Sequence, residues 1–292
     1  MNWLSRTRVT PFRSANFGRA RNGLPSSVRL VLVAWLLMAA RLAAQGDHQI
    51  ATGAAATSAF VHQGRPIHPL CVLFAQEKAS RSRANEFANC SDTSVVPDVS
   101  DGWTTARFPQ QRGYSSYRVL AREGDRFLLA LESSGGGSGE FSDLSWVQVG
   151  STAIRNVKDI LGGDRCAGGL SGYHVDGRTV RLSAASSTVD ILRLAGVRVA
   201  DTVLAKLSSG YRACNGYANY EYDLATDSLV LTSVTLVADG STTVRTDAAS
   251  LRRDPQSCFD ALARHSVVAR KATIGLPELR TFGARFVREC IR

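Results

Sequence analysis

The sequence YHVDGRTVRL at residues 173–182 decides the fold of this chain. Asp176-Gly177 between two short strand-forming runs is the strongest short-range signal of a β-hairpin, because glycine adopts the positive φ that such turns need. Similar paired runs occur on both sides of it. They are 116–122 with 126–131, 144–149 with 152–157, and 217–224 with 228–237. The sequence predicts an α+β fold that is predominantly antiparallel β, in a meander of sandwich-like or barrel-like form.

Helix signals are fewer and concentrate towards the C-terminus. Ser187-Thr188-Val189-Asp190 resembles a capping box and Gly196 is a stop signal, which predicts a short helix over 188–195. Asp254-Pro255 and Pro277 are typical helix starts and predict helices over 254–265 and 277–292. We therefore expect a C-terminal helix pair at 251–292 that packs on a β-rich domain at 66–250.

The N-terminal segment has the pattern of an export signal. An arginine-rich region without acids precedes the uncharged apolar run Leu30–Ala40, and the small residues Ala43 and Ala44 follow. A membrane span needs about 20 apolar residues, so a signal peptide at 1–44, cleaved before Gln45, is favoured over an uncleaved anchor. Residues 45–65 are rich in small and polar residues and are expected to form a flexible linker. The run 67–74 is expected to be the first strand.

Removal of the signal changes the meaning of the net charge. The chain has 35 basic and 25 acidic residues, but seven of the basic residues precede residue 42, so the mature chain is near +3. This excludes a nucleic-acid binder, which needs a concentrated basic surface. Residues 251–292 hold nine basic and four acidic residues. This excess either contacts an anionic surface or partner or, as the sequence favours, forms a solvated helix face.

The mature chain has an even number of cysteines, which in an oxidising compartment predicts a disulfide framework. Cys258 and Cys290 lie on the apolar stripes of the two C-terminal helices, so we expect them to pair. Cys71 and Cys90 are the next most local pair, which leaves Cys166 to Cys214. The cysteine and histidine spacings match no metal motif, and no cofactor-binding fingerprint is present, so neither a metal nor a cofactor is predicted.

Catalytic candidates are weak. Ser171 and His174 are close in sequence, but a nucleophile elbow needs a strand before it and a helix after it, and here a hairpin follows. The acids Glu132, Glu140 and Asp143 flank a Gly/Ser loop and could meet across a hairpin, as paired carboxylates do in glycosidases. Solvated strand ends are the simpler interpretation. The sequence favours a binding protein over an enzyme.

The glycine-rich segment GGDRCAGG at 162–169 is the most distinctive candidate for recognition. Glycines on both sides of Cys166 indicate positive φ angles or close backbone approach. Crosslinked to Cys214, this loop could present a rigid patch with Asp164, Arg165, Tyr173 and Tyr211 as binding residues. The simpler alternative is that the glycines only allow a disulfide to fit between two hairpins.

The function expected from the sequence is that of an exported interaction protein of the bacterial envelope, periplasmic or secreted. Its partner would be a protein, a glycan or another envelope component, and not a nucleic acid. Two alternatives stay open. One is an exported hydrolase with an unidentified site, and the other is an inner-membrane-anchored protein that faces the periplasm, for which the signal would be retained.

The N-terminus of the exported protein separates these alternatives. Cleavage before Gln45 predicts that mass spectrometry of protein isolated from the cell envelope finds a chain that lacks residues 1–44. Replacing Ala44 with Asp removes the small residue at the cleavage position and should leave the longer chain. Isolation of the unsubstituted protein with its N-terminal segment intact would support the anchored form instead.

Overall fold

The computed structural model describes residues 50–52, 54–76, 86–90, 96–108, 112–198, 200–207, 214–237, 254–268 and 272–291. The chain divides into two units, Met1–His48 and Gln49–Arg292. Because the described residues begin at residue 50, the predicted signal segment 1–44 lies outside them. Within the described ranges, no helix is both long enough and apolar enough to cross a membrane.

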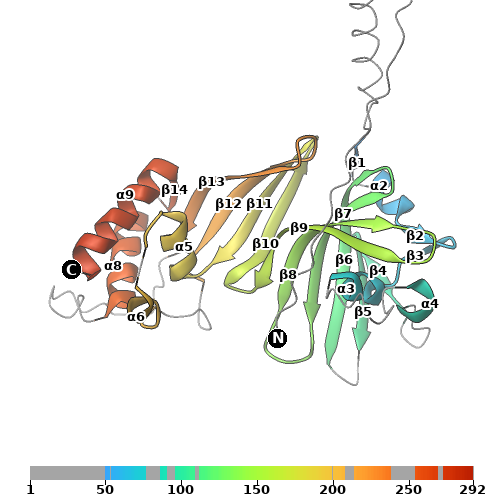
Figure 1. Cartoon of the computed structure of the whole chain (residues 1–292), viewed down its shortest axis with the longest axis horizontal. Coiled ribbons are helices and arrows are strands. Elements are labelled where there is room, and N and C mark those ends of the chain that lie inside the picture. Colours follow the sequence, from blue (N-terminus) through green and yellow to red (C-terminus); the bar gives the residue numbers. More distant parts are fainter. Residues whose placement is uncertain are drawn as a thin grey trace, which may run out of the picture. The chain divides into compact units, whose positions relative to one another are not determined.

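One twelve-stranded sheet forms the framework of the second unit (Figure 1). Eleven strands follow the order β14-β13-β12-β11-β10-β9-β8-β7-β6-β5-β4, and β1 pairs with β6. The strands are β1 (Ala51–Thr52), β4 (Asp98–Ser100), β5 (Trp103–Phe108), β6 (Gly113–Glu123), β7 (Arg126–Ser134), β8 (Phe141–Val149), β9 (Ile154–Asp164), β10 (Ala167–Asp176), β11 (Thr179–Ser186), β12 (Gly216–Asp223), β13 (Ser228–Leu236) and β14 (Thr273–Gly275). A separate hairpin joins β2 (Val61–His62) to β3 (Arg65–Pro66). The sheet is antiparallel except for a short contact between β9 and β10, which confirms the predicted fold class.

The helices lie in two groups within this unit. Beside β6 and β9 are α2 (Ala54–Ala59), α3 (Pro69–Gln76) and α4 (Phe87–Cys90). Beside β13 and β14 are α8 (Pro255–Val268), α9 (Leu276–Phe286) and a π-helical last turn η1 (Val287–Ile291), while α5 (Thr188–Leu194) contacts β11 and β12. The short helix α6 (Asp201–Leu204) follows α5.

The 173–182 stretch forms the predicted hairpin between β10 and β11. Val175 pairs with Val180 and Asp176 with Thr179, and Gly177 turns the chain with a φ of 57°. The other three predicted pairs are β6 with β7, β8 with β9, and β12 with β13, all antiparallel. Local turn chemistry therefore set the strand order of the sheet.

The N-terminal part of the second unit differs from the prediction. Residues 67–74 were expected to form a strand, but Pro69–Gln76 is the helix α3, with Cys71, Val72 and Ala75 buried against the sheet. The expected flexible linker contains α2, and Phe60 behind it is only 1% exposed. Phe60 contacts the rings of Tyr117 and Phe127 edge to face. Burial of an aromatic ring of this size outweighs the weak local propensities of the segment.

A second core, beside the one that contains Phe60, joins β7 and β8 to β11 and β12. Trp146 of β8 and Leu128 of β7 are buried in one cluster with Leu182 and Tyr222 of β11 and β12. The Trp146 indole N–H donates to the Tyr222 hydroxyl (2.6 Å), and that hydroxyl donates to Asp227. A polar link at this depth fixes how β8 faces β12, because unpartnered polar groups there would carry a desolvation penalty.

The C-terminal helices form the third core. The predicted stripe on α9 is buried: Leu279 and Phe286 have no exposed surface, and Phe259 of α8 contacts Phe282 and Phe286 edge to face. The predicted capping box of α5 is also present, with Ser187 and Asp190 exchanging backbone and side-chain hydrogen bonds. Both helix predictions are confirmed.

Three disulfides crosslink the described chain in the predicted pairs. Cys71–Cys90 links α3 to α4, Cys166–Cys214 links the β9–β10 corner to the start of β12, and Cys258–Cys290 links α8 to η1. Their sequence separations are 19, 48 and 32 residues. No described cysteine is free. This chemistry is consistent with an exported protein.

The three crosslinks should stabilise the fold in the order of their loop lengths. In the chain-entropy description, replacing Cys166 and Cys214 with Ser costs about 4 kcal/mol, and replacing Cys71 and Cys90 costs about 3 kcal/mol. Urea unfolding of the oxidised variants measures these differences, with the Cys258/Cys290 pair expected between them. Titration of reactive thiols in the native protein should find none. A native protein with reduced sulfurs would contradict both the crosslinks and the export.

Candidate functional site

The β9–β10 corner is built by glycines that permit close backbone contact. A Cβ added at Gly163 would lie 2.0 Å from the Ala167 carbonyl oxygen, and one at Gly169 would lie 3.0 Å from the Arg165 carbonyl oxygen. Gly168 has a φ of 88°. The close approach and positive φ expected for this glycine-rich segment are both present. The Cys166–Cys214 disulfide holds the corner against β12.

Three of the four predicted recognition residues lie in the described part of the chain. Asp164 accepts a hydrogen bond from the Glu140 backbone N–H (3.2 Å), and Arg165 forms an exposed ion pair with Glu140 (3.8 Å). Tyr173 instead packs against the core between β8 and β12, with the Arg118 guanidinium 6.0 Å from its ring centroid. Tyr211 lies outside the described residues. Whether Asp164, Arg165 and Tyr173 bind anything stays a prediction.

Ser171 and His174 occupy exposed positions on β10, but the serine hydroxyl is already engaged. Ser171 Oγ donates to the Ser183 carbonyl oxygen (2.9 Å). A nucleophile must direct its proton to a base, and this geometry directs it to the backbone. His174 lies opposite Arg181 of β11. The Ser171 hydroxyl is therefore not arranged as an activated nucleophile.

His174 does line a hollow of about 380 Å³ on the exposed face of β10–β13, which we name the polar hollow. Its volume falls within the range of about 300–1,000 Å³ typical of ligand sites. The residues that line it come from four neighbouring strands. They are Gly172, Tyr173 and His174 of β10, Arg181, Leu182 and Ser183 of β11, Asn219, Tyr220 and Glu221 of β12, and Thr232 of β13. Tyr173, Leu182 and Tyr220 pair with one another in register and pack against the core behind the sheet, where Tyr222 is buried.

Strand register arranges these residues in two rows. Gly172, Ser183, Asn219 and Ser233 lie opposite one another across β10 to β13, which defines the serine row. The charged row is displaced by two residues along β10 to β12 and comprises His174, Arg181, Glu221 and, on β13, Val230. Residues two apart on a strand share a face, so both rows point to the same side.

Asn219 organises the serine row. Its Oδ1 accepts from Ser183 Oγ (2.8 Å), while its Nδ2 donates to Ser233 Oγ (3.1 Å) and Thr235 Oγ1 (3.0 Å). The Thr235 hydroxyl also shares a hydrogen bond with that of Thr273 on β14 (3.0 Å). This network fixes the orientation of four hydroxyl groups and one amide before any ligand arrives, which lowers the entropic cost of binding.

The charged row carries opposite charges in contact. Arg181 lies 3.3 Å from Asp176 and 3.7 Å from Glu221. All three side chains are more than half exposed, so these ion pairs contribute little stability. Their effect is on the surface potential, because the one guanidinium contacts a carboxylate on each side and the two carboxylates outnumber it. Gly172 provides the open space beside this row, since an added Cβ there meets no atom within 4 Å.

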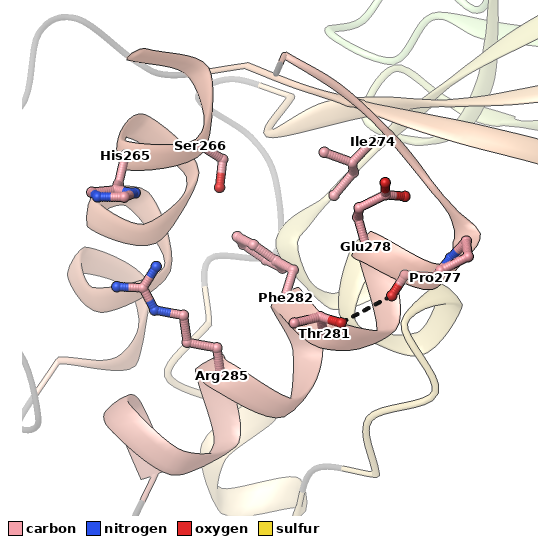
Figure 2. A pocket seen from close by; sticks show the side chains of 8 residues that line it. All are labelled: His265, Ser266, Ile274, Pro277, Glu278, Thr281, Phe282 and Arg285. Atoms are coloured by element: carbon pink, nitrogen blue, oxygen red, sulfur yellow. Dashed lines mark hydrogen bonds between the residues drawn. The ribbon is translucent and has the colours of Figure 1, made fainter. Parts of the chain in front are cut away.

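A second hollow, of about 370 Å³, lies between α8 and α9 (Figure 2). His265 and Ser266 of α8 line one side, and Phe282 and Arg285 of α9 line the other. His265, in the last turn of α8, is exposed and lines this hollow.

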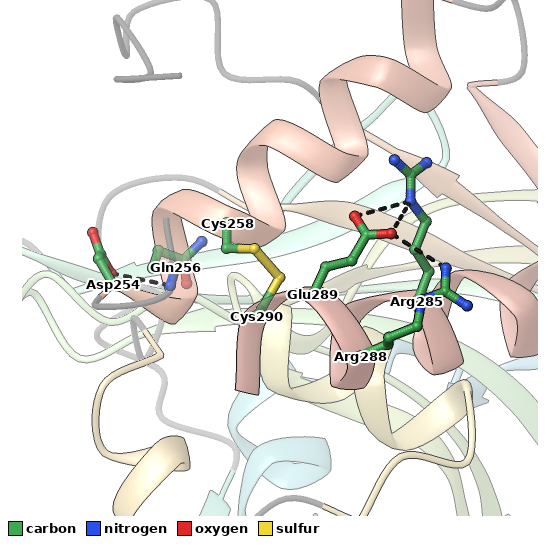
Figure 3. The surroundings of a disulfide bond; sticks show 7 residues. All are labelled: Asp254, Gln256, Cys258, Arg285, Arg288, Glu289 and Cys290. Atoms are coloured by element: carbon green, nitrogen blue, oxygen red, sulfur yellow. Dashed lines mark hydrogen bonds and ion pairs between the residues drawn. A yellow bond between two sulfur atoms is a disulfide. The ribbon is translucent and has the colours of Figure 1, made fainter. Parts of the chain in front are cut away.

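The basic character expected for the C-terminal tail is balanced in the described helices. Residues 254–268 and 272–291 contain four arginines and four acids. Figure 3 shows Glu289 between Arg285 and Arg288, with contacts of 3.1 and 3.2 Å, next to the Cys258–Cys290 disulfide. The five other basic residues of the tail lie outside the described residues.

The acids around the Gly/Ser loop lie on two faces of the sheet. Glu132 pairs in register with Ser142, whereas Asp143 pairs with Leu131 and therefore points to the opposite side. Partial desolvation and the nearby Glu140 raise the pKa of Glu132. Burial and the Asp159 carboxylate raise the pKa of Asp143 to about 6. Within the described ranges, no three metal-ligating side chains converge on one point.

Comparison with known proteins adds no assignment. No family model matches the chain, and neither a curated protein nor a solved structure resembles it significantly. The candidate site therefore rests on its own geometry. Polar residues alternate with Tyr220 and Tyr222 along β12, so Asn219 and Glu221 share the other face. The strand register then places them beside Ser183 and Arg181.

The raised pKa of Asp143 predicts a pH-dependent stability. Its folded-state pKa of about 6 lies above the ordinary value of 3.8, so the folded state binds more protons and stability falls as pH rises between these values. Asp143→Asn should therefore raise the unfolding temperature at pH 7 and change it little at pH 3.5. Asp98→Asn, at an exposed position of β4, is the matched control for loss of one carboxylate. Equal effects of Asp143→Asn at both pH values would contradict the assignment.

Proposed function

We propose that this is an exported, disulfide-crosslinked binding protein that holds its ligand in the polar hollow of β10–β13. The observation that carries the proposal is the ordered side-chain network around Asn219 on a sheet face whose reverse side is core. Such a network is costly to arrange and unnecessary for solubility alone. The three disulfides support the exported location.

Rigidity favours binding at this position. The strands β10 to β13 are anchored from behind by Leu182 and Tyr222 and at one end by the Cys166–Cys214 disulfide. Sites built on strands hold side chains more accurately than sites on loops. The serine row therefore presents its hydroxyl groups in a fixed geometry.

The chemistry of the hollow does not favour catalysis. Its carboxylate Glu221 is exposed and contacts Arg181, and the nearby Ser171 donates to a backbone carbonyl. A general acid or base works in a position from which water is excluded. An exposed surface does not supply such a position, whereas it can form many hydrogen bonds with a bound molecule.

A bulky side chain at Gly172 tests the proposal directly. Gly172→Trp fills the hollow, and the absence of neighbours around an added Cβ predicts that the fold tolerates it. The exported, oxidised protein is immobilised and incubated with envelope extract from its source cells. We expect the material retained by the unsubstituted protein to fall at least tenfold with this variant.

Gly137→Trp is the matched control, because Gly137 is exposed in the loop after β7 and an added Cβ there also meets nothing. Gly137→Trp should retain the same material as the unsubstituted protein, and both tryptophan variants should have the unfolding temperature of the unsubstituted protein. Equal retention by both tryptophan variants would refute binding at the polar hollow, as would failure of the unsubstituted protein to retain anything.

A further inference from the structure

The polar hollow also restricts the chemical class of its ligand, and this step rests on the proposed function. We infer that the ligand is a neutral oligosaccharide that lies along the serine row. The inference depends on three properties of the hollow: the pairing of its charged groups, its shortage of apolar anchors and the free hydrogen-bonding capacity of its hydroxyl groups.

Paired charges argue against ionic ligands. Proteins that bind phosphate or nucleic acid present arginine or lysine side chains free to pair with the anion. Here Arg181 lies between Asp176 and Glu221, so an anion would have to displace a carboxylate from it. A cation would have to compete with Arg181 for the two carboxylates. A neutral ligand meets neither cost.

The shortage of apolar anchors argues against a peptide or lipid. Interfaces with proteins obtain most of their energy from large buried side chains such as Trp and Tyr. In the described part of the chain, the large hydrophobic side chains that are exposed are Val61, Val96, Val99, Phe141, Val157 and Val230. Of these, Val230 alone belongs to either row. The larger side chains that line the hollow, Tyr173, Leu182 and Tyr220, lie between the two rows in register and pack against the core behind the sheet. They are therefore engaged by the core and are not presented as anchors for a peptide or a lipid.

The hydroxyl groups retain the capacity that a sugar needs. Ser183 Oγ donates to Asn219 and keeps its lone pairs as acceptors, whereas Ser233 Oγ accepts from Asn219 and keeps its proton as a donor. Glu221 adds a further acceptor at the charged row. A sugar hydroxyl both donates and accepts, so alternating donors and acceptors fit it better than they fit a molecule with one kind of group.

The length of the serine row indicates more than one sugar ring. Gly172, Ser183, Asn219 and Ser233 span four neighbouring strands, which lie about 4.8 Å apart. The row therefore extends over roughly 14 Å. At one end Gly172 leaves the surface open, so a chain could continue past β10.

The first test uses immobilised neutral oligosaccharides of glucose, galactose and N-acetylglucosamine, with a sulfated oligosaccharide as the charged comparison. The unsubstituted protein and Gly137→Trp should bind at least one neutral member, and Gly172→Trp should bind it at least tenfold more weakly. Its affinity should change less than twofold between 50 and 500 mM NaCl, because no net charge is neutralised on binding. Binding to the sulfated sugar alone, with steep salt dependence, would overturn the inference, as would binding to no neutral member.

The second test separates this inference from the proposed function. Envelope extract is treated with periodate, which cleaves the vicinal diols of sugars, or with proteinase, before incubation with the immobilised protein. Proteinase should leave the retention that Gly172→Trp lowers. Periodate should abolish that retention where the first test identifies a glucose or galactose oligosaccharide with free vicinal diols, because the internal residues of a 1→4-linked N-acetylglucosamine oligomer have none. If retention depends on Gly172 but is lost after proteinase and survives periodate, the binding function stands and the oligosaccharide is wrong. If retention does not depend on Gly172, both proposals fail.

Discussion

The contact between the backbone at Gly163 and the carbonyl of Ala167 is the constraint on which the arrangement of the sheet depends. No residue with a side chain fits at Gly163 without moving the corner, and the corner is where the antiparallel order is interrupted by the short β9–β10 contact. Because the chain turns there, Leu182 and Tyr222 reach the same core as Leu128 and Trp146. The Cys166–Cys214 disulfide then crosslinks this turn to the start of β12.

The same turn explains why one face of β10–β13 is available for binding. Strands alternate their side chains, so the packing of Leu182 and Tyr222 behind the sheet leaves Ser183 and Glu221 in front. The helices α5, α8 and α9 pack with residues such as Val234 on the buried side. Strand alternation thus accounts for the polar side chains on the face that carries the two rows. It does not account for the hydrogen bonds that Asn219 forms with Ser183, Ser233 and Thr235.

Local chemistry made much of the fold predictable. Asp176-Gly177 indicated a hairpin, Ser187 a helix start, and the stripe ending at Cys290 both a helix and its crosslink. Where tertiary packing decides, prediction failed: Phe60 becomes core through contacts with Tyr117 and Phe127, which are more than 50 residues away in sequence. The candidate site could be predicted from the sequence only in part, for the same reason. His174 was singled out, but its partners Arg181 and Glu221 follow from register, and a bulge between Asn219 and Tyr220 shifts that register on β13.

The edges of the sheet have a consequence for the behaviour of the protein at high concentration. Long, flat edge strands offer unpaired backbone groups to other copies and promote aggregation. In this sheet both terminal strands, β4 and β14, are three residues long. Each end of this large antiparallel sheet therefore offers a further copy only a short length of backbone on which to add a strand.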